Sequence, residues 1–69
     1  MSKRELKALE GYHVSVALRD GSRLDDCQLV SSGRGSARTL WLFNGGTDVF
    51  VPHEEVADLW EVVPRHHAA

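Results

Sequence analysis

The segment from His53 to Ala57 begins like the zinc-binding helix of a metalloprotease, with a histidine followed directly by glutamate. In that motif two histidines four residues apart bind the metal, and the glutamate acts as general base. Ala57 occupies the position at which the second histidine is required. The segment therefore predicts no zinc site.

A second group of reactive residue types combines Asp25, Asp26 and Cys27 with His13. They could form a metal or nucleophile site only if the fold gathered them, and a single cysteine is more commonly a small buried side chain. Catalysis needs a nucleophile, a base and oxyanion donors in one place, and no stretch of this sequence offers that set. We therefore expect a protein that is not an enzyme and that uses no cofactor, metal or small-molecule substrate.

Basic side chains occur in two places, in the opening segment and around a glycine-rich loop. They are Lys3, Arg4, Lys7, Arg34 and Arg38. A surface that binds a phosphate backbone needs several basic side chains on one face with few acidic residues between them. Here Glu5 and Glu10 lie among the basic residues of the opening segment. Gly33-Arg34-Gly35 is also too short to cradle a nucleotide. The basic residues predict either a solvated surface or contacts to nucleic acid or to an acidic partner.

The stretch from Arg38 to Val51 predicts a β-hairpin, because Asn44-Gly45-Gly46-Thr47 is a strong signal for a tight turn between two apolar runs. Side chains of a strand alternate between its two faces, and either possible register gives the same partition. One face carries Leu40, Leu42, Val49 and Val51, and the other carries Trp41, Phe43, Asp48 and Phe50. Both faces of this hairpin are therefore apolar.

If the aliphatic face fills the core, then Trp41, Phe43 and Phe50 project outward, and Trp60 joins them from the last strand. An aromatic side chain buries about 150 to 250 Å², so three rings left in water forgo on the order of 10 kcal/mol. We expect something to cover them. The alternatives are the N-terminal helix with Tyr12, a second copy or a partner protein, and stacked nucleobases.

The elements before this hairpin follow from helical spacing and strand alternation. Ser2-Lys3-Arg4-Glu5 has the form of a capping box and opens a helix over residues 3–10, which Gly11 ends. A strand over residues 12–19 places Tyr12, Val14, Val16 and Leu18 on one face and leads into the turn at Asp20-Gly21.

The next strand covers about residues 23–31. A bulge at Asp25-Asp26 would keep its apolar residues on one face. After the hairpin, residues 52–56 predict one helical turn, and residues 58–63 predict a last strand.

A chain of 69 residues is a single small domain, which we place at residues 1–63 with a flexible tail at 64–69. It buries only about 60% of its unfolded surface, so stabilisation by association is expected. No apolar run approaches the roughly 18 residues of a membrane span, and we expect a cytoplasmic protein that binds no membrane. The formal net charge of −2 combines a basic first half with an acidic second half, which favours a partner of mixed charge.

This order of elements resembles the Sm-like and SH3-like small β-barrels, including Hfq-type rings and the small barrels that inhibit the Rho terminator. The resemblance spans about residues 2–63. Val14-Ser15-Val16-Ala17-Leu18-Arg19-Asp20-Gly21 looks like the first Sm motif. The resemblance implies a mainly β fold, in which a short N-terminal α-helix is followed by a five-stranded barrel (residues 12–63) with a 3-10 turn before the last strand.

The RNA-binding motifs of that family are replaced in this chain. The Ser31 to Ala37 loop stands where Sm-like rings place an Asp/Asn pair, and Pro52-His53 stands where the second motif has Arg/Lys-Gly. A fold can carry over while its ligand does not.

We therefore expect a non-enzymatic interaction module with a regulatory role. It would associate with itself or bind a partner protein through Trp41, Phe43, Phe50 and Trp60. The alternative is an Sm-like RNA-binding or single-stranded nucleic-acid-binding protein that uses the basic residues.

Overall fold

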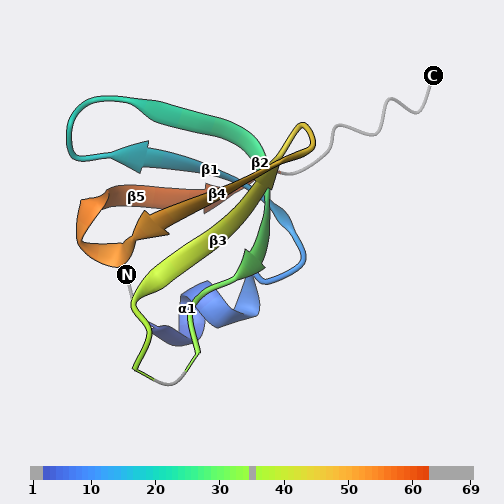
Figure 1. Ribbon diagram of the computed structural model, residues 1–69, viewed down its shortest axis with the longest axis vertical. Coiled ribbons are helices and arrows are strands. Elements are labelled where there is room, and N and C mark those ends of the chain that lie inside the picture. The colour runs from blue at the N-terminus through green and yellow to red at the C-terminus, as the bar shows by residue number, and fades with distance from the viewer. Residues whose placement is uncertain (1–2, 35, 63–69) are drawn as a thin grey trace.

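The computed structural model describes residues 3–34 and 36–62 (Figure 1). Its elements are α1 (Lys3–Ala8), β1 (His13–Leu18), β2 (Arg23–Ser31), β3 (Thr39–Asn44), β4 (Thr47–Pro52), the 3-10 turn η1 (His53–Glu55) and β5 (Val56–Glu61). The strands form one antiparallel sheet in the order β4-β3-β2-β1-β5. The expected mainly β fold with one short N-terminal helix, five strands and a 3-10 turn before the last strand is confirmed.

In the first hairpin, Val16 lies opposite Leu24. The register shifts between Val14 and Val16, opposite Asp26, whose φ of 54° is left-handed. This is the expected bulge, and the extra residue turns Cys27 onto the same side as Leu24. Without it, the two halves of β2 would face opposite sides of the sheet.

The second hairpin pairs Asn44 with Thr47, so its loop has only two residues, Gly45 and Gly46. Both have positive φ, as a tight primed turn requires. The predicted partition of the side chains is confirmed. The aliphatic residues of β3 and β4 are buried or partly buried, and the alternate residues are exposed.

The core is formed by side chains from one face of the sheet together with Leu6 of α1, and Figure 1 shows α1 below the curved sheet. Its buried members come from the helix and from every strand. They are Leu6, Val14, Val16, Cys27, Leu29, Leu40, Leu42, Val51 and Leu59. Burial raises the pKa of the Cys27 thiol, and the nearby charges of Asp26 and Asp25 add to this effect. Within the described part of the chain, no helix has the length and apolar character needed to cross a membrane.

Two details of the N-terminal part differ from expectation. The helix ends at Ala8 instead of residue 10, because the next turns close on carbonyls three residues back and the Gly11 amide donates to the carbonyl of Leu29. Tyr12 is exposed instead of sharing the buried face of β1, since it still belongs to the turn and its amide bonds to the Leu9 carbonyl. The capping residue Ser2 and the tail at 64–69 lie outside the described residues.

Substitution of Gly33 measures how closely the backbone of the β2–β3 loop is packed around this residue. Its φ is 105°, and a Cβ at this position would lie 2.4 Å from the Ala37 carbonyl oxygen. We expect Gly33→Ala to lower the free energy of unfolding by about 3 kcal/mol, because the strain of a positive φ, about 1–3 kcal/mol, is joined by a backbone clash. Urea unfolding followed by tryptophan fluorescence measures the loss.

Gly46→Ala is the matched control, since Gly46 has a φ of 89° but no atom within 4 Å of a built Cβ. It carries the strain without the clash. Equal losses for the two variants would contradict a closely packed loop.

Candidate interaction surfaces

Three rings share the outer face of β3 and β4. We call Trp41, Phe43 and Phe50 the aromatic platform. Trp41 and Phe50 lie opposite one another on the paired strands, with ring centroids 5.8 Å apart and an angle of 29° between the planes. The Trp41 indole Nε1–H also donates to the Asp48 carboxylate at 2.9 Å. The indole is thus held at its face and at its edge, which fixes its orientation before any partner binds.

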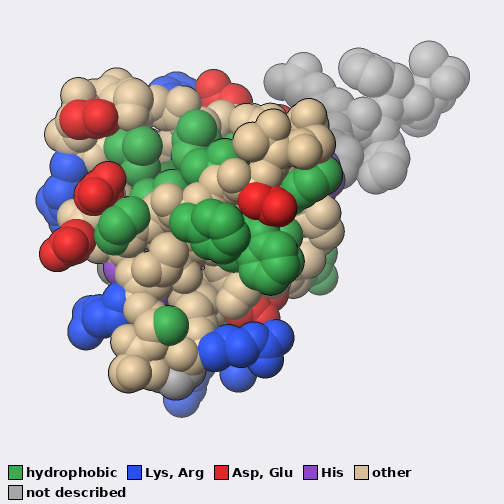
Figure 2. Space-filling model, in the orientation of Figure 1, with side chains coloured by type: hydrophobic (Ala, Val, Ile, Leu, Met, Phe, Trp, Pro, Cys, Tyr) green, Lys and Arg blue, Asp and Glu red, His purple; other side chains and the backbone are tan. Residues whose placement is uncertain are grey.

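The exposed fractions of the rings decide whether the chain covers them itself. They are 39% for Trp41, 40% for Phe43 and 61% for Phe50. The α1 helix sends Leu6 into the core, and Tyr12 is itself exposed. Figure 2 shows hydrophobic side chains gathered on the face that β3 and β4 present. The helix and Tyr12 therefore leave the aromatic platform open.

Trp60 belongs to a different contact. The guanidinium carbon of Arg23 lies 5.3 Å from the centroid of its ring, and Nη2 of Arg23 donates to the Asp25 carboxylate at 2.7 Å. This hydrogen bond is the main reason that the pKa of Asp25 lies below its usual value. No ring contact joins Trp60 to the aromatic platform in residues 3–34 and 36–62. The structure thus brings together three of the four predicted rings, and an arginine partly covers the fourth.

Three of the predicted basic residues line one cavity between α1 and the β2–β3 loop. Arg4 and Lys7 come from the helix and Arg34 from the loop, around a volume of about 770 Å³. We call these three residues the basic cluster. Lys3 belongs to the same helix, and its side chain lies outside the described part.

Glu10 borders the same cavity, but its carboxylate is engaged. It accepts hydrogen bonds from the Ser32 amide at 2.8 Å and the Ser32 hydroxyl at 2.7 Å. These two bonds lower the pKa of Glu10, with a further contribution from the charges of Lys7 and Arg34. Ser32 is almost fully buried, so this contact fixes the loop against the turn that follows α1.

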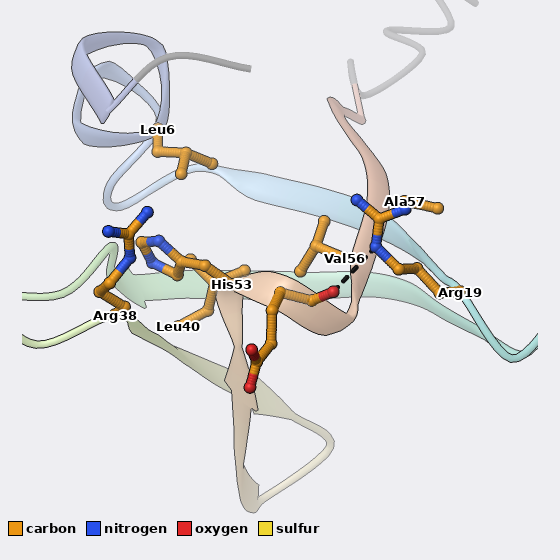
Figure 3. A pocket seen from close by; sticks show the side chains of 8 residues that line it. Leu6, Arg19, Arg38, Leu40, His53, Val56 and Ala57 are labelled. Atoms are coloured by element: carbon orange, nitrogen blue, oxygen red, sulfur yellow. Dashed lines mark hydrogen bonds between the residues drawn. The ribbon is translucent and has the colours of Figure 1, made fainter.

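Arg38 lies in a second cavity, of about 560 Å³, together with Arg19, His53 and Glu54 (Figure 3). Figure 3 shows Arg38 beside His53 at one end and Arg19 at the other, with Leu6 reaching in from α1. The Arg19 Nε–H donates to the Glu54 carbonyl at 2.8 Å. Among the described residues, the Arg38 guanidinium has no hydrogen-bond or ion-pair partner.

His53 connects the two cavities through Ser32. Its Nε2 lies 2.8 Å from the Ser32 carbonyl oxygen. Because a carbonyl oxygen only accepts hydrogen bonds, Nε2 carries the proton and donates it to this contact. Sequence reasoning missed Arg19 and His53. Arg19 reads as the end of a strand and His53 as the residue after Pro52, and neither spacing indicates that the two line one cavity.

The remaining candidate group is only partly assembled. His13 Nδ1 lies 2.9 Å from the Asp26 carboxylate, at the bulge, whereas Cys27 points into the core. Over residues 3–34 and 36–62, no group of three or more histidine, cysteine or acidic side chains could hold a metal ion. Comparison of the chain with protein-family models, curated proteins and solved structures finds no match.

The Glu10–Ser32 contact makes stability depend on pH. Folding lowers the pKa of Glu10 from its ordinary value of 4.5. The stabilisation of the fold by the ionised Glu10 carboxylate is therefore complete above pH 4.5, and it is lost as the pH falls through the lower pKa of the folded state. We expect Glu10→Gln to flatten the fall in stability over this acid range, as measured by urea unfolding at a series of pH values. Glu61→Gln makes the same change of charge on β5, away from Ser32, and should keep the wild-type profile. A Glu10→Gln profile identical to the wild type would show that the contact does not stabilise the fold.

Proposed function

We propose that this chain is a small barrel of the Sm-like or SH3-like kind that acts, without catalysis, as a regulatory interaction module. It binds a partner protein or a second copy of itself through the aromatic platform. The observation that carries the proposal is the exposure of three large rings on one hairpin, where Trp41 stacks on Phe50 and donates a hydrogen bond to Asp48. The sheet, the short N-terminal helix and the 3-10 turn support the barrel assignment.

The energetics of the platform favour binding. Tryptophan is among the residues that dominate interface energies, and rings already fixed in place lose little conformational entropy when a partner docks. The platform is fixed in this way, because Trp41 is stacked on Phe50 and donates to Asp48. Beneath it, the buried Leu40, Leu42 and Val51 hold the two strands to the core.

Trp41→Ala tests the proposal. We expect it to weaken association by about 2 kcal/mol or more, roughly 30-fold in Kd, because it removes a central anchor. Self-association is measured by light scattering over a range of concentrations, and partner binding by quantitative affinity capture from the native host. Urea unfolding, with Trp60 as the fluorophore, checks that the variant stays folded.

Trp60→Ala is the matched control, since it removes a ring of the same size and similar exposure that lies against Arg23, outside the aromatic platform. It should weaken association much less than Trp41→Ala. A wild-type chain that stays monomeric at high concentration and captures no protein would contradict the proposal.

The basic cluster favours a second candidate function, the binding of single-stranded nucleic acid. Arg4, Lys7 and Arg34 surround one cavity, and the single acid in its lining, Glu10, is already hydrogen-bonded to Ser32. Arg38 and Arg19 lie in the neighbouring cavity. Such a set could follow a phosphate backbone, while the rings offer faces on which bases stack.

Salt dependence separates this function from the first. If the cluster binds phosphates, the affinity for oligo-uridine or oligo-adenine falls steeply with salt, and each lost contact reduces the slope of log affinity against log salt by about 0.7. Fluorescence anisotropy on Lys7→Gln and Arg34→Gln should show this loss. Arg23→Gln, outside both cavities, serves as the control. Absence of binding at low salt would exclude the function.

A further inference from the structure

The surface of the aromatic platform carries negative charge beside its apolar rings. Asp48 is the single charged residue between Thr39 and Pro52, and it lies on the outer face with the rings. One carboxylate oxygen accepts the Trp41 N–H, and the exposed carboxylate keeps further acceptor capacity. The faces of aromatic rings carry partial negative charge, and no lysine or arginine of the hairpin offsets it. A cation with a flat, weakly hydrated surface complements such a site.

The position of β4 indicates how a partner would present this cation. At the end of the sheet, β4 pairs only with β3 among the described strands. An extended segment can add to such an edge through main-chain hydrogen bonds. Directly opposite side chains of paired strands have Cβ atoms about 4.5–5.5 Å apart. Alternate side chains of an added strand would therefore lie beside Asp48 and Phe50.

Resting on the function proposed above, we infer that the platform recognises an extended segment of a different protein that carries an arginine between apolar residues. The guanidinium lies over the Trp41–Phe50 pair and donates to the Asp48 carboxylate, and an apolar neighbour contacts Phe43. Arginine fits better than lysine, because a planar guanidinium stacks on a ring while it donates in its own plane. The chain shows the same combination elsewhere, where Arg23 lies over Trp60 and donates to Asp25.

A peptide titration tests this inference. The probe is acetyl-Thr-Val-Thr-Arg-Thr-Val-Thr-amide, compared with the same peptide carrying citrulline, which keeps the planar shape of arginine but has no charge. Binding is followed by NMR through the indole N–H signal of Trp41. We expect the arginine peptide to bind about 3- to 30-fold more tightly, as an exposed cation–π contact combined with an exposed ion pair allows.

Asp48→Asn is the decisive variant, since asparagine still accepts the Trp41 N–H but carries no charge. It should lower the ratio of the two affinities to the part that the cation–π contact supplies, because only the ion pair is lost. Asp58→Asn removes an exposed carboxylate from β5 instead and should leave the ratio unchanged.

Three results would overturn the inference. Equal affinity of both peptides in the wild type shows a platform that binds apolar segments without selecting a cation, and the proposed function then stands. A Trp41 signal already shifted by self-association, and unaffected by peptide, assigns the platform to a second copy. If no peptide shifts the signal, the arginine segment is excluded, and the proposed function fails as well only if Trp41→Ala also leaves every association unchanged.

Discussion

The alternation of side chains along the β3–β4 hairpin is the constraint on which the surface of this protein depends. Leu40, Leu42 and Val51 are needed inside, where they complete the core. Because successive residues of a strand point to opposite faces, burying this set forces Trp41 and Phe50 outward. A shift of register by one residue would exchange the two sets. The core and the aromatic platform are therefore specified together, and neither can be moved without the other.

A second constraint acts at the opposite end of the hairpin. Ser32 binds Glu10 through its amide and hydroxyl, and its carbonyl accepts from His53. One buried residue thus joins the turn after α1, the β2–β3 loop and η1. The amide of His53 in turn donates to the Arg38 carbonyl. These contacts give a loop rich in glycine and serine a defined path, and they position the cationic side chains around the two cavities.

Much of the fold could be predicted from the sequence because its determinants are local. The Asp-Gly and Gly-Gly turns set the registers of two hairpins, and the break in alternation at Asp25-Asp26 placed the bulge. The outward direction of Trp41 followed from the same alternation. The features that could not be predicted depend on contacts between segments that are far apart in the sequence. Arg19 and His53 come from segments 34 residues apart, and the cover of Trp60 comes from Arg23 on another strand.

The end of the helix shows the limit in a different way. Helical spacing continues to Glu10, but the Gly11 amide finds a partner in β2, and the last turn tightens to reach it. The tertiary contact outweighs the local preference, as it commonly does in a helix too short to be stable alone. Glu10 is thereby released from the helix and becomes available to bind Ser32.

The buried thiol of Cys27 has a practical consequence. It is the single cysteine of the chain, it is inaccessible to solvent in the fold, and its raised pKa keeps it protonated. A soluble disulfide reagent reacts with thiolates, so it must wait until β2 detaches from its neighbours. The rate of thiol labelling therefore reports how often the sheet opens, with no dye or tag attached. A molecule that binds only the closed form lowers the rate of thiol labelling, and the decrease is proportional to the fraction of the protein that it occupies.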